Sequence, residues 1–292
     1  MKAIELNSVP PMSLLYLRAL TSRRGASVPE DMQALGEVLL QGQRIDEKRL
    51  RAYCRVCGFT AEQQVPATYP FVLAVPLHLQ LLVSDAFPCS VLGVVHVANE
   101  ITQYRAIKPS EALDFRCILS GARPARRGFE FELLTQVSVA GELVWECTST
   151  LLSRDKRGAS RARRNERKPD DPMTPDAVIP WLVPADTGRR YARVSGDSNP
   201  IHLYALTAKL FGFPRAIAHG MWTKARCLAE LEEALDSPSF ERGFRVSVTF
   251  RQPVFLPSKV QFERVEEAGS IRFSVSKTTE QKLYLSGQVT GL

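Results

Sequence analysis

The sequence predicts an α+β protein in which the same order of elements, helices first and an antiparallel meander afterwards, occurs twice. In each half of the chain, extended segments with alternating apolar and polar residues follow an apolar helical run. A strongly basic segment separates the two halves of the 292-residue sequence, and short blocks on its two sides match in the same order. This plan predicts two antiparallel sheets, each wrapping a central helix.

The first half opens with two helical segments. Residues 45–57 have amphipathic spacing and predict a short helix, and the apolar run 72–83 predicts the central one. The strands that come next are predicted at 90–107, 111–121, 128–138 and 142–152. These elements make up the first copy of the plan.

The second half repeats it. A short amphipathic helix ends at Val194, and residues 216–235 predict a longer one. Within the first predicted strand, Val246, Val248 and Phe250 alternate with polar residues, which is typical of a strand with one buried face. The four strands of this copy are predicted at 243–251, 259–267, 270–277 and 282–290.

Three pairs of sequence blocks indicate an internal duplication. They are Tyr53–Phe59 with Tyr191–Asp197, Pro70–Pro76 with Pro214–Gly220, and Pro109-Ser110 with Pro257-Ser258. Their offsets are 138, 144 and 148 residues, a slow drift of the kind that small loop insertions produce. The order of the blocks is kept, which favours duplication over chance similarity.

The basic segment, residues 153–168, holds eight Lys or Arg against two acids, and so carries a net +6 of the chain's +7. A run this poor in apolar residues is typical of a solvated linker. It could also form an electropositive rim that attracts a phosphorylated ligand. A nucleic-acid patch is less well supported, because no aromatic residues are interleaved for base stacking. We therefore predict domains over 1–152 and 175–292, joined by a basic linker over 153–174.

Composition restricts the class of protein further. With 45% hydrophobic and 24% charged residues the chain can bury a sizeable core, and no apolar run approaches the length of a bilayer span. The amino terminus does not have a secretory signal pattern, so we expect a cytoplasmic protein. The six cysteines are scattered, and the Cys54-x-x-Cys57 pair has no second pair to complete a zinc site, so reduced, buried thiols are expected.

Residues with catalytic potential are concentrated between 191 and 222. Gly196 and Pro200 predict a turn over Asp197–His202, which would bring a carboxylate and an imidazole into one space. Further along, His219-Gly220 opens the long helix, where backbone N–H groups lack intrahelical acceptors and the helix dipole is positive. Such a helix start can stabilise a developing oxyanion.

These residues also carry a resemblance to a known family. The run from Tyr191 through Val194-Ser195-Gly196-Asp197, Asn199-Pro200-Ile201-His202, and then Ile217–Met221, resembles the signature of the MaoC-like, (R)-specific enoyl-CoA hydratases and 3-hydroxyacyl-thioester dehydratases. Residues 250–257 are similar to the strand and turn that come after the central helix in that family. The resemblance implies a double hot-dog fold.

It also implies a lyase that hydrates trans-2-enoyl thioesters to (R)-3-hydroxyacyl thioesters, or runs the reverse dehydration, in fatty-acid metabolism. No resident cofactor or metal is expected, and coenzyme A or acyl carrier protein enters as part of the substrate. No nucleic-acid or membrane partner is expected. The two halves would pack like a dimer within one chain, and the chain could also pair as a homodimer.

The resemblance assigns roles to the residues of the motif. Asp197 and His202 would share the acid and base roles, in an order that the sequence leaves open. Gly220 would donate its backbone N–H to the thioester oxygen, with no side chain to obstruct close approach. Asn199 and Ser195 would support the turn.

Other residues are expected to bind the substrate. Arg251 is a candidate contact for the phosphates of coenzyme A, and His219 either binds substrate or makes a structural hydrogen bond at the helix start. Val72, Leu73 and Leu77 of the first half are expected to line a tunnel for the acyl tail.

The first copy has a different set of residues at the matching positions. Phe59 stands where the second copy has Asp197, no histidine matches His202, and Pro76, which has no N–H, aligns with Gly220. We therefore expect one active site per chain. Two other functions remain open: a thioesterase, since hot-dog folds also hydrolyse thioesters, and a non-catalytic module that binds acyl thioesters.

Overall fold

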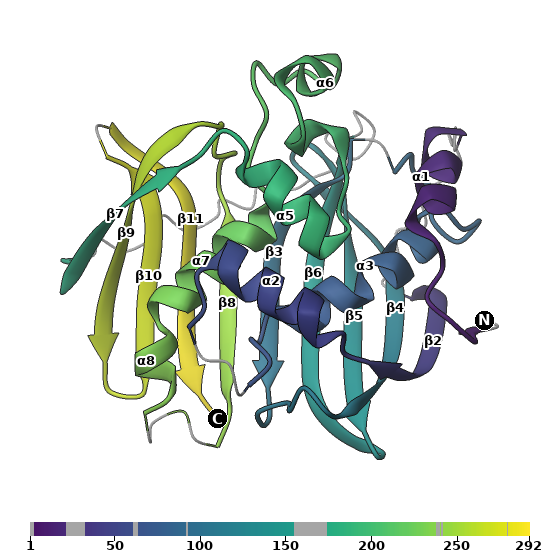
Figure 1. The fold of residues 1–292 in the computed structure, drawn as a ribbon. Helices are drawn as coiled ribbons and strands as arrows, with labels where there is room; N and C mark the ends of the chain where they lie inside the picture. The colour runs from purple at the N-terminus through teal and green to yellow at the C-terminus, as the bar shows by residue number, and fades with distance from the viewer. Residues whose placement is uncertain are drawn as a thin grey trace. The chain divides into compact units, whose positions relative to one another are not determined.

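A computed structural model describes residues 3–21, 33–60, 64–91, 93–154, 174–237, 240, 242–278 and 280–292 (Figure 1). Most of the predicted basic linker, residues 155–173, lies outside these described residues. Contacts divide the chain into two compact units: unit 1 is residues 1–44, 73–99 and 110–169, and unit 2 is residues 45–72, 100–109 and 170–292. The grouping reflects contacts and not the sequence repeat, so the predicted domain boundaries stay a prediction.

Unit 1 is a sheet with one central helix. Its elements are β1 (Ile4–Leu6), α1 (Met12–Thr21), β2 (Ala34–Arg44), most of α3 (Tyr69–Leu82), the start of β3 (Val95–Gln103), β4 (Ala112–Ala125), β5 (Gly128–Val139) and β6 (Glu142–Arg154). The strand order is β1-β2-β4-β5-β6; β1 runs parallel to β2 and the other neighbours are antiparallel.

The central helix α3 packs on this sheet. His78 of α3 shares a hydrogen bond of 2.7 Å with the hydroxyl of Thr135 in β5. A Cβ atom at Gly36 of β2 would lie 3.1 Å from the Leu81 side chain, so a glycine lets this strand approach the helix closely. On the outer side, Leu15 and Ala19 of α1 pack against α3 residues and extend the core.

Unit 2 has the second set of antiparallel strands and the second central helix. Its elements are α2 (Glu47–Cys57), β7 (Ala177–Val183), α5 (Thr187–Ser195), the 3₁₀ turn η1 (Pro200–His202), α6 (Ala205–Leu210), α7 (Gly220–Glu230), α8 (Glu232–Leu235), β8 (Phe244–Phe250), β9 (Ser258–Glu267), β10 (Ser270–Lys277) and β11 (Glu280–Gly291). The strands are antiparallel in the order β8-β11-β10-β9-β7. Lys224 of α7 is fully buried and donates to the Val246 carbonyl of β8 at 3.1 Å, which fixes the helix on the sheet.

Helix α2 belongs to unit 2 and packs against α5 and α7. The Arg49 side chain donates to the Val194 carbonyl at 2.8 Å, and Trp222 Nε1 donates to the Val56 carbonyl at 3.1 Å. The Tyr53 and Tyr191 rings lie 6.1 Å apart. Helices from both halves of the sequence therefore support the same core.

Sequence periodicity located most elements correctly. The eight predicted strands correspond to β3–β6 and β8–β11, and the predicted short helices correspond to α2 and α5. The long helix is shorter than predicted, because residues 216–218 are extended: Leu256 donates to the Ala216 carbonyl at 2.8 Å and Ala218 donates to the Val254 carbonyl at 2.9 Å. Among the described residues, five elements were not predicted: β1, α1, β2, β7 and α6.

The cysteines and the helices bear on two further expectations. All six cysteines are thiols outside any disulfide, and all are buried except the partly exposed Cys54. Burial raises the pKa of the Cys57 thiol and so keeps it protonated. Among the helices of the described residues, none combines the length and the apolar character needed to cross a bilayer.

Candidate active site

Helix α5 delivers Asp197 to the site. The helix ends at Gly196, which adopts the left-handed conformation (φ 82°) and donates to the Ala192 carbonyl. The chain then leaves the helix axis at Asp197, whose N–H is bonded to the Ser195 hydroxyl at 3.1 Å. The Asp197 side chain is 37% exposed, so the carboxylate remains accessible to water or substrate.

A network of short-range hydrogen bonds shapes the turn after Asp197. The Asn199 N–H donates to Asp197 Oδ1 at 3.2 Å, and the Asn199 side chain accepts from the Ile201 N–H. Pro200 begins η1, where its fixed φ suits a helical turn. These contacts of Ser195 and Asn199 orient the carboxylate, and the supporting roles of the two residues in the reaction stay a prediction.

His202 lies at the end of η1 and is buried. Its Nδ1 is 2.9 Å from the Ile217 carbonyl oxygen, and a carbonyl can only accept, so Nδ1 carries the proton. Burial lowers the pKa of His202, against the opposing effect of Asp197, and so favours the neutral ring. No described residue bonds to Nε2, which therefore presents a lone pair.

His219 lies between two other rings. Its centroid is 3.7 Å from that of His202, in a stacked arrangement, and 4.8 Å from that of Tyr191. Its Nε2 donates to the Asp197 backbone carbonyl at 3.0 Å and is 3.8 Å from Asp197 Oδ2. Burial, with His202 adding to it, lowers the pKa of His219 to about 3, so this ring is neutral and acts through its N–H.

Gly220 is the first residue of α7, with His219 as its N-cap. N–H groups in the first turn of a helix have no intrahelical acceptor and lie at the positive end of the dipole. A Cβ atom at this position would be 3.0 Å from the ring of Phe250 in β8. The glycine therefore leaves room between the helix start and the strand.

A second glycine, Gly188 of α5, allows η1 to approach α5 closely. A Cβ atom at Gly188 would lie 1.9 Å from the His202 carbonyl oxygen, a severe overlap. Ile217 donates to the Ile201 carbonyl at 3.1 Å, so the segment before α7 is bonded to η1. These contacts bring Asp197, His202 and His219 together, with ligand atoms within 4.8 Å of one another.

A carboxylate and two imidazoles at this separation could in principle hold a metal ion. The two rings, however, are stacked with an interplanar angle of 26°. The nitrogen lone pairs of an imidazole lie in the ring plane, so those of stacked rings run side by side and do not converge on one ion. The arrangement suits polarisation of a water or hydroxyl better than chelation.

Comparison with known proteins identifies the family of the chain. Residues 161–287 match the family described as MaoC like domain. The 3-hydroxyacyl-thioester dehydratase X of Mycobacterium tuberculosis (strain ATCC 25618 / H37Rv) is 36% identical over 248 residues, which cover 85% of this chain and 86% of that protein. The chain belongs to the MaoC-like dehydratase family.

Solved structures of MaoC-like dehydratases extend the likeness to three dimensions. The crystal structure of HtdX of Mycobacterium tuberculosis superposes with a TM-score of 0.75 at 34% identity, over 88% of this chain and 100% of that one. A MaoC-like dehydratase from Phytophthora capsici gives a TM-score of 0.72 at 18% identity, over 91% and 98% of the two chains, and shows the fold alone. The α+β hot-dog fold and the family resemblance are thereby confirmed.

The other residues predicted to bind substrate in this MaoC-like dehydratase lie outside the cluster of Asp197, His202 and His219. Arg251 comes directly after β8, and its Nε lies 3.4 Å from the Ser286 hydroxyl. Val72, Leu73 and Leu77 lie on α3 with exposures of 0%, 7% and 0%, so they are core residues whose access to an acyl chain stays a prediction. Tyr191, Gly188 and Phe250 were missed as site residues, because stacking and close approach leave no spacing signal.

The alignment of Pro76 with Gly220 is wrong. Helix α3 begins at Tyr69, so Pro76 lies inside the helix and the residue matching Gly220 is Tyr69. The Tyr69 N–H donates to the Pro66 carbonyl at 2.7 Å and so cannot serve as a free donor. One active site per chain stays a prediction, which now rests on Tyr69 and not on Pro76.

Proposed function

We propose that the chain catalyses the dehydration of (R)-3-hydroxyacyl thioesters to trans-2-enoyl thioesters, and the reverse hydration, in fatty-acid metabolism. Its membership of the MaoC-like dehydratase family and its likeness to a protein named 3-hydroxyacyl-thioester dehydratase X support this reaction class. The observation that carries the proposal is the neutral His202, with Nδ1–H bonded to Ile217, beside the accessible carboxylate of Asp197.

The tautomer of His202 suggests how the two groups divide the work. In the dehydration direction Nε2 accepts the C2 proton of the substrate, and the electrons of that C–H bond form the C2=C3 double bond. The C3–O bond breaks, and the imidazolium returns the proton to the departing hydroxyl, which leaves as water. Asp197 accepts a hydrogen bond from this hydroxyl and stabilises the transient imidazolium. Hydration reverses these steps.

Charge that develops on the thioester oxygen needs its own donor. The Gly220 N–H, at the positive end of α7, supplies it in a position where no side chain intervenes. His219 holds the Asp197 backbone through its Nε2 donor and is a positioning residue. Its role as a direct substrate contact is not needed for the chemistry.

The substrate is an acyl thioester of coenzyme A or acyl carrier protein. We propose that the protein acts on it in the cytoplasm. Arg251 is the proposed contact for the phosphate groups of the carrier, and the α3 residues Val72, Leu73 and Leu77 for the acyl tail. One active site per chain, in the domain formed by residues 175–292, is part of the proposal. A homodimer would add a second site.

The test is an assay that separates lyase from hydrolase chemistry. Purified protein is mixed with trans-2-enoyl-CoA thioesters of increasing chain length, and absorbance of the conjugated thioester is followed together with free thiol. Loss of conjugation without thiol release, with (R)-3-hydroxyacyl product on a chiral column, is expected. Thiol release would instead identify a thioesterase, and binding without any turnover would identify a non-catalytic module.

A further inference from the structure

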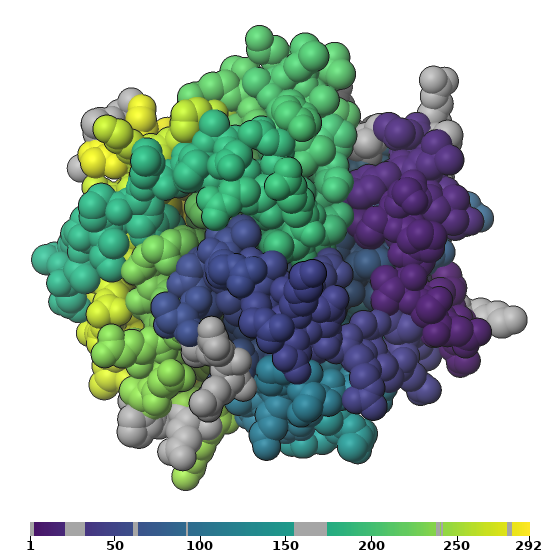
Figure 2. Space-filling model, viewed as in Figure 1, coloured from purple at the N-terminus to yellow at the C-terminus, as the bar shows by residue number. Residues whose placement is uncertain are grey.

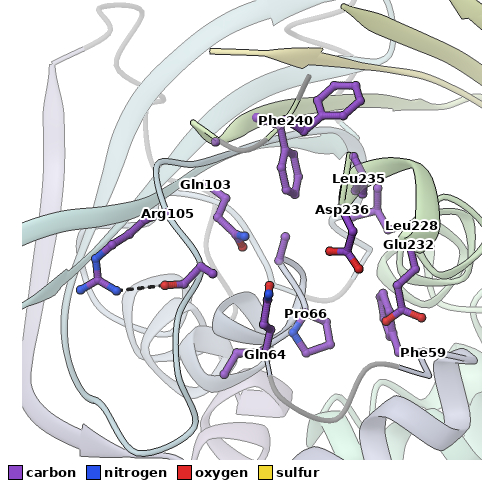
Figure 3. Close-up of a pocket in the computed structure, with 15 residues that line it drawn as sticks. Phe59, Gln64, Pro66, Gln103, Arg105, Leu228, Glu232, Leu235, Asp236 and Phe240 are labelled. Carbon is purple, nitrogen blue, oxygen red and sulfur yellow. Dashed lines mark hydrogen bonds between the residues drawn. The ribbon is translucent and has the colours of Figure 1, made fainter. Parts of the chain in front are cut away.

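Unit 2 contains a pocket of about 260 Å³ that the proposed reaction does not use. Its walls come from the segments after α2, before α3 and after β3, together with the end of α7 and α8 (Figure 3). The pocket residue Leu228 lies more than two helical turns beyond Gly220. Asp197, His202 and His219 do not line it. The pocket is therefore separate from the catalytic cluster.

Its position is the first-copy counterpart of the active site. Phe59 lies after α2 as Asp197 lies after α5, and residues 65–67 precede α3 as residues 216–218 precede α7. In both copies the segment before the central helix bonds to the segment after a strand: Val65 donates to the Ile107 carbonyl at 3.0 Å, and Ala218 donates to the Val254 carbonyl at 2.9 Å. The pocket thus lies at the corresponding place of the first copy, and no Asp–His pair lines it.

One wall of the pocket carries an unsatisfied acceptor. Gln103, at the end of β3, is 8% exposed, and its Oε1 is buried without a hydrogen-bond partner among the described residues. Figure 3 shows the Gln103 amide directed toward the open centre of the pocket. A buried acceptor without a donor costs free energy, which a bound N–H or O–H group would recover.

The charged groups of the pocket limit what can bind. The carboxylates of Glu232 and Asp236 enter from the α8 side, whereas the Arg105 guanidinium is directed outward (Figure 3). Glu232 accepts from the Thr60 N–H at 2.8 Å and from its hydroxyl at 2.7 Å, so it is fixed in place. A phosphate or carboxylate would be repelled here.

Apolar side chains form much of the remaining surface, including Phe59, Leu228, Leu235 and Phe240. They suit an aliphatic chain, whose burial is favourable in proportion to its area. We propose that this pocket is a second, non-catalytic binding site for a small uncharged molecule with an aliphatic body and one N–H or O–H donor, such as a primary amide or alcohol. The donor bonds to Gln103 Oε1, and the aliphatic body contacts the apolar wall.

Binding of three matched molecules to the full chain tests this proposal. Hexanamide and hexan-1-ol are expected to bind, as measured by titration calorimetry and saturation-transfer NMR, whereas hexanoate binds at least about tenfold more weakly because of its charge. Gln103→Met removes the acceptor at similar volume and is expected to weaken hexanamide binding about tenfold. Gln288→Met, the same change at an exposed position on β11, leaves it unaltered.

Further variants separate this pocket from the active site. Leu235→Trp fills the pocket and abolishes hexanamide binding while enoyl-thioester turnover persists, and Asp197→Asn removes turnover while hexanamide still binds. If Gln103→Met fails to fold, Leu235→Trp decides alone. Absence of binding, equal affinity for hexanoate, insensitivity to these pocket variants, or loss of hexanamide binding in Asp197→Asn overturns the proposal.

Discussion

The segment from α2 to α3 and the segment from α5 to α7 share a local plan but differ in the connection between their two helices. Both α2 and α5 end at a glycine in the left-handed conformation, Gly58 (φ 89°) and Gly196 (φ 82°). The connection to the central helix then covers residues 59–68 in the first copy and 197–219 in the second, which is more than twice as long.

The longer connection of the second copy contains the proposed catalytic histidine. It contains η1 with His202, and also α6, which lies in the green region of the surface (Figure 2). Leu206 and Leu210 of α6 are 76% and 79% exposed. The sequence of the first copy's connection, residues 59–68, contains no histidine. In the second copy the Tyr191 ring lies beside the His219 ring. At the corresponding place in the first copy, the buried Tyr53 donates to the Thr68 hydroxyl at 2.7 Å. The two copies thus differ in the length of this connection, and the longer one contains the proposed catalytic histidine.

The largest effect is expected when the proposed catalytic pair, Asp197 and His202, is removed. Asp197→Asn and His202→Gln are each expected to lower kcat by about 10²–10⁴, because the acid–base step is lost. Phe59→Asp, which restores a carboxylate to the first copy, should not rescue Asp197→Asn. The matched control is His78→Gln, a buried histidine on α3, for which we expect near wild-type rates in the enoyl-thioester assay. Rescue by Phe59→Asp would show that the first copy is still competent.

A second experiment tests the role of the Gly220 N–H at the start of α7. Gly220→Pro deletes the N–H at the first helical position, where proline is tolerated, and His219 already has the extended conformation that precedes proline. We expect kcat to fall by about 10²–10³ relative to Gly220→Ala, which keeps the N–H and makes the same contact with Phe250. Similar rates for the two variants would remove Gly220 from the oxyanion role.

A smaller effect is expected at His219. His219→Leu removes the donor to the Asp197 carbonyl, and we expect kcat to fall about tenfold with little change in KM. His219→Gln can keep an N–H donor and should recover part of the rate. If His219→Leu chiefly raised KM, a substrate-contact role would be favoured over positioning.

The smallest expected effect is a change in stability with pH. Burial lowers the pKa of both His78 and His219 to about 3, so between about pH 6.5 and pH 3 the unfolded chain binds protons that the folded chain does not. The free energy of unfolding should therefore fall as pH falls through this window, by up to about 1.4 kcal/mol per pH unit for each histidine. Urea unfolding at several pH values measures the slope, and His78→Gln should reduce it. A slope unchanged in that variant would contradict the assignment.

Local patterns in the sequence were sufficient to predict much of the fold and the position of the site. Alternation located eight strands, and the glycine and proline around Asp197 predicted the turn that holds it. The features that could not be predicted depend on contacts between distant segments. The tautomer of His202 is set by the carbonyl of Ile217, and the need for Gly188 is set by the carbonyl of His202. Strand β2 was missed because its alternation is broken by the apolar run Val38-Leu39-Leu40 and by two register shifts against β4. Pro76 was misaligned because an insertion hides the true helix start.

The bonds from α2 to its neighbours have a consequence for how the two halves can be separated. Arg49 caps the last turn of α5, and Trp222 of α7 bonds to the Val56 carbonyl, so the active half depends on a helix from the inactive one. A fragment restricted to residues 175–292 would lose these contacts and expose Tyr191 and Trp222, both of which are buried in the whole chain. Helix α2 of the first half is therefore part of the scaffold around α5 and α7, and we expect a fragment of residues 175–292 to be less stable than the whole chain.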